Sequence, residues 1–137
     1  MQRETPGAAL LDLSVLIDAA RDWGDAASAL ETRASDLLAS GPLDTRRGAR
    51  AAARINRALM RQERALTQRE GVAGRPWFRH QIYAPGLVTG YAVQELPGLR
   101  DAVEQGDEQT ARRGRALLLA SLLEAARLAR QGAGPPA

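Results

Sequence analysis

The sequence of 137 residues contains no cysteine, no lysine and a single histidine, His80. Without cysteine there is no disulfide framework, no cysteine-ligated zinc and no cysteine nucleophile. Without lysine there is neither a Schiff-base amine nor the lysine of a phosphate-binding loop. A single histidine also excludes any metal motif that needs two. These absences argue against catalysis by this chain, and we expect no catalytic residue, no bound metal and no cofactor.

Long apolar runs are also missing. No stretch reaches 18 apolar residues and the first residues do not follow a signal-peptide pattern, so we expect no membrane segment and leave the compartment open. All 19 basic residues are arginine, against 16 acidic residues, which gives a net charge of +3. The pI near 10.5 therefore reflects the chemistry of arginine rather than a large excess of positive charge.

What the sequence does contain is helical periodicity. Apolar residues recur at three- and four-residue steps and predict four helices, at about residues 8–39, 44–70, 97–105 and 108–131. We predict helix starts at Thr5-Pro6, Asp44 and Asp107, and helix ends at Gly41-Pro42 and Gly71. We expect an all-α, four-helix bundle-like domain over residues 1–131 and a disordered tail over 132–137.

The last predicted helix is apolar nearly all round. A helix of a small bundle needs an apolar face of only about three-sevenths of its surface to reach its own core. The leucines of this helix exceed that face, so some of them need another surface. We therefore predict a homodimer interface with three candidate residues: Leu119, Leu122 and Leu123.

Residues 71–96 lie between the second and third predicted helices and break the helical pattern. The segment is rich in glycine and proline, yet it holds four of the five aromatic residues. Irregular segments of about 25 residues are uncommon in compact domains. We expect a long ordered loop, anchored by Trp77, Phe78 and Tyr83, because each aromatic side chain can bury about 150–250 Å².

The same segment carries a specific resemblance. Residues 74–85 read Gly-Arg-Pro-Trp-Phe-Arg-His-Gln-Ile-Tyr-Ala-Pro, and the match continues in Gly90-Tyr91-Ala92 and in residues 96–102. This stretch resembles the transferrin-receptor-like dimerisation domain at the C-terminus of zinc peptidases of the glutamate carboxypeptidase and prostate-specific membrane antigen type. Its strong part covers about residues 55–103, and the flanking helices agree in order and length.

The resemblance implies a helical domain that packs two protomers together. It further implies a parent with a two-zinc protease domain and an apical domain, neither of which these 137 residues contain. We therefore expect an excised domain or a remnant of a larger peptidase, with zinc only in the protease domain. The expected partners are a second copy of the chain and those two parental domains. Docking on the protease domain alone is a further alternative.

The resemblance also implies roles for single residues. Tyr91 matches a tyrosine whose hydroxyl contacts a substrate carboxylate, and Gly90 stands where glutamate-specific members have lysine, so the pocket loses a cation. From the residues alone, a lone His80 is expected to be structural, because zinc needs three or four protein ligands. Arg75 and Arg79 are expected to hold the loop, in a motif whose structural residues are Arg75, Pro76, Trp77, Phe78, Arg79, His80, Tyr83 and Pro85.

A stripe of arginines on the second predicted helix offers a different interpretation. The residues recur every three or four positions: Arg47, Arg50, Arg54, Arg57, Arg61 and Arg64. Such a stripe is also found in basic helical modules that bind nucleic acid, which is the alternative function. Pairing with the acids of the first helix explains the stripe without nucleic acid, and those acids also follow helical spacing: Asp12, Asp18, Asp22 and Asp25. A basic face that is simply exposed to solvent is the other explanation, and we expect no nucleic-acid partner.

Overall fold

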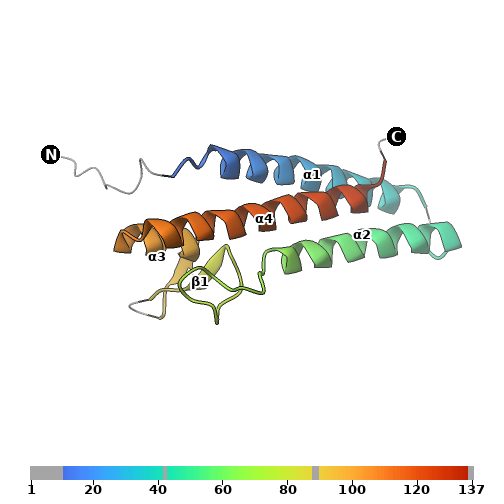
Figure 1. Ribbon diagram of the computed structural model, residues 1–137. Coiled ribbons are helices and arrows are strands. Elements are labelled where there is room, and N and C mark those ends of the chain that lie inside the picture. Colours follow the sequence, from blue (N-terminus) through green and yellow to red (C-terminus); the bar gives the residue numbers. More distant parts are fainter. Residues whose placement is uncertain (1–10, 42, 88–89, 136–137) are drawn as a thin grey trace. The chain divides into compact units, whose positions relative to one another are not determined.

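The computed structural model describes residues 11–41, 43–87 and 90–135. Within these ranges the elements follow the order α1 (Ser14–Ala39), α2 (Arg46–Ala65), β1 (Tyr83–Pro85), β2 (Val93–Glu95), α3 (Pro97–Gln105) and α4 (Glu108–Ala133) (Figure 1). The predicted all-α class is confirmed: four helices carry the fold, and a long connection separates α2 from α3. The predicted start of the first helix at Thr5-Pro6 lies outside the described residues, as does Pro42.

The chain divides into two compact units, and the division falls within α1 and within α4. One unit combines Met1–Ile17 with Leu66–Ser121, and the other combines Asp18–Ala65 with Leu122–Ala137. We call them the hairpin unit and the three-helix unit, because the first contains β1 and β2, and the second consists of α2 and parts of α1 and α4.

The three-helix unit is built on small side chains. Its core joins Leu30 of α1 and Ile55 of α2 to alanines at positions 26, 58 and 129. A Cβ added at Gly132 of α4 would lie 2.3 Å from the Cβ of Ala58, so only glycine fits there. One turn after Ala58 in α2, the Gln62 side chain accepts a hydrogen bond of 2.8 Å from the Trp23 indole. Alanine and glycine thus let the helices approach closely.

The hairpin unit is organised around α3 and the first half of α4. A Cβ at Gly114 of α4 would lie 2.5 Å from the carbonyl oxygen of Gly98 in α3, so the two backbones touch. Val72 and Ala102 are almost fully buried in this unit. β1 and β2 form an antiparallel ribbon of three residue pairs, in which Ala84 faces Gln94 across the strands. Because so short a ribbon has little stability of its own, the rest of the unit must hold it.

The helix termini show where the predictions were right and where they were wrong. Asp107 is confirmed as the cap of α4, because its carboxylate accepts from the Thr110 amide and from the Thr110 hydroxyl. Those hydrogen bonds, the hydroxyl first, lower the pKa of Asp107. At the start of α2 the cap is Thr45 rather than Asp44, since the Gly48 amide donates to the Thr45 hydroxyl oxygen.

Two predicted helix ends require correction. α2 stops at Ala65 and does not run to residue 70, because the Leu66 carbonyl accepts from the Gln81 amide and the Gln68 amide donates to the Arg79 carbonyl. The predicted disordered tail also began too early. α4 continues through Ala133, and Gly132 is buried against α1 and α2 of the three-helix unit. Residues 136–137 lie outside the described residues.

Candidate functional site

A buried ion pair between Arg75 and Asp101 of α3 holds the hairpin in place. Arg75 Nε lies 2.8 Å from Asp101 Oδ2, and the two side chains are only 4% and 7% exposed. The contact is close but is not aligned as a hydrogen bond. Arg75 Nη1 also donates to the Pro85 carbonyl in β1, and Gln94 in β2 donates to Asp101 Oδ1 at 2.8 Å. One buried pair therefore ties both strands to α3. The positions of β1 and α3 can be followed in Figure 1.

The loop that leads into the hairpin is held by a second buried polar side chain. Gln81 is 3% exposed, and its amide nitrogen donates to the Gly71 carbonyl at 3.1 Å and the Arg79 carbonyl at 3.0 Å. Gly71 has φ +76°, and a Cβ there would lie 2.2 Å from the Pro76 carbonyl oxygen. The loop doubles back so tightly that position 71 accepts only glycine.

His80 serves the same loop through its ring. Its Nδ1 accepts from the backbone amides of Ile82 and Tyr83, each at 3.2 Å. The ring stacks on that of Tyr83, with centroids 5.9 Å apart. Through these two contacts the ring supports the entry to β1 as a hydrogen-bond acceptor.

The aromatic anchors predicted for this loop are wrong in part. Trp77 is 70% exposed and Tyr83 is 53% exposed. Phe78 is half-buried and lies under the Arg75 guanidinium, with its ring centroid 5.4 Å from the guanidinium carbon. The burial comes instead from Arg75, Gln81 and small apolar residues, because the tight backbone leaves little room for large rings. Pro76 and Arg79 are also exposed, and Arg79 contributes through its carbonyl oxygen.

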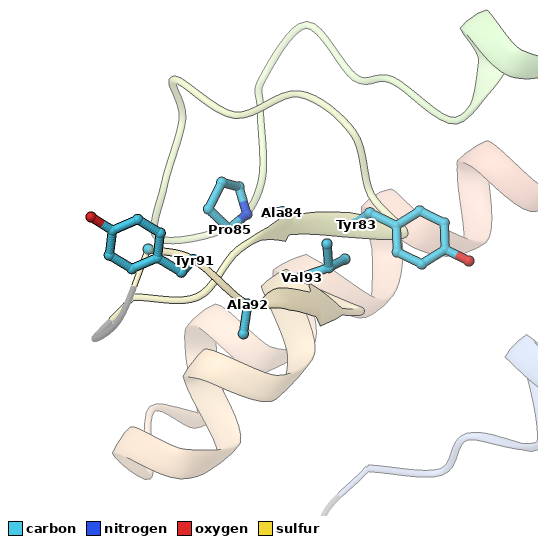
Figure 2. Close-up of a pocket in the computed structure, with 7 residues that line it drawn as sticks. Tyr83, Ala84, Pro85, Tyr91, Ala92 and Val93 are labelled. Carbon is cyan, nitrogen blue, oxygen red and sulfur yellow. The ribbon is translucent and has the colours of Figure 1, made fainter.

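The turn of the hairpin presents Tyr91 to solvent. Its side chain is 99% exposed, and Figure 2 shows it at the turn end of the ribbon, with Tyr83 at the opposite end. Gly90 has φ +65°, a backbone conformation that favours glycine over lysine or any other L-residue. Beside the turn is an open pocket of about 250 Å³, lined by Tyr83, Ala84, Pro85, Gly90, Tyr91, Ala92 and Val93.

The chemistry of this pocket is simple. Its lining carries no ionisable group other than the two phenols, and the Tyr91 phenol is the donor that stands at the turn. A phenol donates one hydrogen bond to an anion and offers an apolar ring to a protein surface. The site can therefore contact a carboxylate or pack against another protein.

The three predicted interface leucines have different surroundings. Leu123 is 50% exposed, Leu119 is partly buried, and Leu122 is 5% exposed. Leu122 is therefore covered within the chain itself, whereas Leu119 and Leu123 keep surface that a second protomer could contact. The helical wheel could not separate Leu122 from its neighbours, because the helix is apolar on nearly every side.

The predicted pairing between the acids of α1 and the arginines of α2 is also wrong. Asp22 binds Arg130 of α4 at 2.8 Å, Asp18 lies 4.0 Å from Arg21, and Asp12 accepts from the Ser14 amide. Apart from Arg64, no arginine of α2 lies within 4.0 Å of a carboxylate belonging to residues 11–41, 43–87 or 90–135. Apart from Arg64, the arginines of this stripe therefore have no ion-pair partner among the described residues.

In the described ranges, no three histidine, aspartate or glutamate side chains gather where they could share a metal ion. Among the helices that the structure describes, none combines the length and apolar character that crossing a bilayer requires.

Comparisons with known proteins agree with the motif in the loop. A probable glutamate carboxypeptidase of Arabidopsis thaliana is 33% identical over 94 residues, which cover 69% of this chain and 12% of that protein. A probable glutamate carboxypeptidase of Arthroderma benhamiae is 38% identical over 48 residues, 35% of this chain and 7% of that protein. A maize protein of the same description is 35% identical over 51 residues, 37% of this chain and 7% of that protein.

The chain therefore spans about one-eighth or less of the length of these relatives. The model of the transferrin receptor-like dimerisation domain matches residues 11–130, which include both units and the hairpin. From its helices, its loop motif and this match, the chain belongs to the transferrin receptor-like dimerisation domain family.

Proposed function

We propose that this chain is a protein-association domain that forms homodimers and that serves a glutamate-carboxypeptidase-like peptidase. In that parent, the hairpin lines the substrate pocket and Tyr91 donates to a substrate carboxylate, while a zinc-bearing protease domain carries out the hydrolysis. The support is the family membership together with the glutamate carboxypeptidases among the relatives. No role in nucleic-acid binding is proposed.

The observation that carries the hairpin proposal is the contrast between its tip and its base. Tyr91 is 99% exposed, whereas the Arg75–Asp101 pair beneath the strands is at most 7% exposed. If Tyr91 only packed against its own loop, its side chain would be covered. If the hairpin were a mobile loop, it would have no use for a buried ion pair beneath its strands. A rigid base with an uncovered phenol suits contact with a neighbouring surface, because little ordering is required on contact.

The role of Tyr91 is tested in the full-length parent. Tyr91→Phe removes one hydrogen bond to a charged group, so KM for a peptide with a C-terminal acidic residue should rise about tenfold to a hundredfold. Tyr83→Phe is the matched control, since it removes a phenol from the other end of the same hairpin. Equal, small effects of both variants would place the hairpin outside the substrate pocket.

Self-association is tested on the chain itself. Leu123 is 50% exposed on α4, and an arginine there introduces charge without filling a core position. We expect sedimentation to give twice the 14.7 kDa chain mass for the unsubstituted chain and 14.7 kDa for Leu123→Arg. Leu38→Arg changes an equally apolar residue of α1 that is 69% exposed and should leave the dimer intact.

If the unsubstituted chain is a folded monomer at about 100 μM, this chain does not form homodimers, since a stable interface buries about 1,200 Å² or more. That result would favour a domain that docks only on its own protease domain. Loss of the dimer in both variants would show that α4 is not the specific interface.

A further inference from the structure

A concave basic surface lies in the three-helix unit, apart from the residues that the proposed function uses. It is an open hollow of about 430 Å³, lined by Ala51 and by five exposed arginines: Arg33 of α1 and Arg46, Arg47, Arg50 and Arg54 of α2. We call it the arginine cavity. Its volume falls within the range of about 300–1,000 Å³ that is typical of small-ligand sites. All of its lining residues except one alanine carry a guanidinium group.

Among the described residues, no ion pair neutralises the positive charge of the arginine cavity. None of its five arginines lies within 4.0 Å of a carboxylate in the part of the chain that the structure describes. Asp36 lines the adjoining cavity of about 460 Å³, which shares Arg33 and Arg47, but it forms no ion pair with either. Like charges held together without counter-charges destabilise the folded state and favour an anion at the same place.

The position of the arginines on α2 adds to this cost. Arg46 and Arg47 occupy the first turn, where α2 has no acidic residue. The N-terminal end of a helix carries a partial positive charge, so acidic side chains stabilise it and arginines do not. Residues that oppose local electrostatics are expected at functional sites. A bound anion would satisfy both the arginines and the helix terminus.

Arg54 shows that part of the cavity is already in place. Its Nε donates to the Gly132 carbonyl of α4 at 3.3 Å, which leaves the terminal nitrogens of the guanidinium for another acceptor. Gly132 is itself fixed, because a Cβ there would lie 2.3 Å from the Ala58 Cβ. A guanidinium held in this way loses less conformational freedom when it binds a ligand.

We propose that the arginine cavity binds a compact anion that carries two or more phosphoryl groups. Guanidinium forks match phosphate oxygens in pairs, and several arginines around one cavity suit several phosphoryl groups better than one carboxylate. From Arg46 to Arg54 the helix rises only about 12 Å, which suits a small polyphosphate rather than a long duplex. The anion is a free polyphosphate or the phosphorylated headgroup of a lipid.

The test is calorimetric titration of the full chain with inorganic triphosphate at about 100 mM NaCl. We expect one site per chain. Arg47→Ala with Arg50→Ala should weaken binding about tenfold or more, since each removes hydrogen bonds to a charged group. Arg57→Ala with Arg61→Ala is the matched control: it removes the same charge from the same helix, outside the cavity, and should change the affinity less than about threefold.

The alternatives give distinct results. Equal weakening by both double variants, or no binding of triphosphate at millimolar concentration, would refute a built site. A hexaglutamate peptide or a 20-base-pair duplex that binds more tightly than triphosphate would also refute it, in favour of an acidic protein or a nucleic acid. Retention on vesicles with phosphorylated phosphoinositides, lost only in the Arg47/Arg50 variant, supports the site and identifies a lipid as its source. Circular dichroism confirms the helicity of every variant.

Discussion

Removal of the Asp101 carboxylate should destabilise the chain more than any change on its surface. In Asp101→Ala, the Arg75 guanidinium stays buried with the Pro85 carbonyl and the Phe78 ring as its contacts, and Gln94 loses its acceptor. Loss of one partner of a buried ion pair costs about 3–5 kcal/mol. Because small domains have about 5–15 kcal/mol of total stability, this single change should remove about a fifth or more of it.

Glu104→Ala is the matched comparison, because it removes another paired carboxylate from the same helix. Glu104 binds Arg100 at 3.1 Å, but the two side chains are 62% and 60% exposed. An exposed pair contributes about 0–1 kcal/mol, so the free energy of unfolding of this variant should be close to that of the unsubstituted chain. Urea unfolding followed by circular dichroism measures both. A loss below about 1.5 kcal/mol for Asp101→Ala would refute the view that this pair carries the hairpin.

Four further outcomes are expected. Gly24→Ala should stabilise the chain by about 1 kcal/mol, because nothing lies within 4 Å of the added Cβ. Gly114→Ala should destabilise it in the same urea assay, since the Cβ meets the Gly98 carbonyl at 2.5 Å. Trp77→Ala should change the free energy of unfolding by no more than about 0.5 kcal/mol, as this side chain is 70% exposed. Asp107→Asn should lose stability relative to the parent at neutral pH but not in acid. The lowered pKa of Asp107 gives stabilisation that is complete above its ordinary pKa of about 3.9 and is lost as the pH falls through the lowered value.

Contrary results would be equally specific. Stabilisation by Gly114→Ala would mean that α3 and α4 do not touch at this point. A large loss in Trp77→Ala would restore the aromatic anchor that the sequence suggested. A constant difference between Asp107→Asn and the parent at every pH would show that the charge of the cap has no role.

The helices were predictable because their signals are local. The spacing of apolar residues located all four, and Pro97 and Asp107 set the starts of α3 and α4 closely. The end of α2 was not predictable in this way. Leu66 and Gln68 leave the helix to pair with residues more than ten positions ahead, and no local pattern reports such a tertiary contact.

The site was predictable as a segment but not as a geometry. The density of aromatics marked residues 71–96, and the motif within it identified Tyr91. Size alone then suggested that Trp77 anchors the loop, whereas the buried positions belong to Arg75 and Gln81. Charged and polar residues are expected at the surface, and only their pairing partners make burial favourable. For Arg75 that partner is Asp101, which lies 26 positions away in the sequence.

The short length of the hairpin has a consequence for how this part of the molecule opens. Three residue pairs cannot form a ribbon alone, so the two strands persist only while Arg75 and Asp101 remain joined. The strands and α3 should therefore exchange their amide hydrogens together, as one cooperative unit with one opening free energy. Tyr91 then keeps its position for as long as α3 stays folded, and whatever loosens that nine-residue helix also releases the tyrosine at the turn.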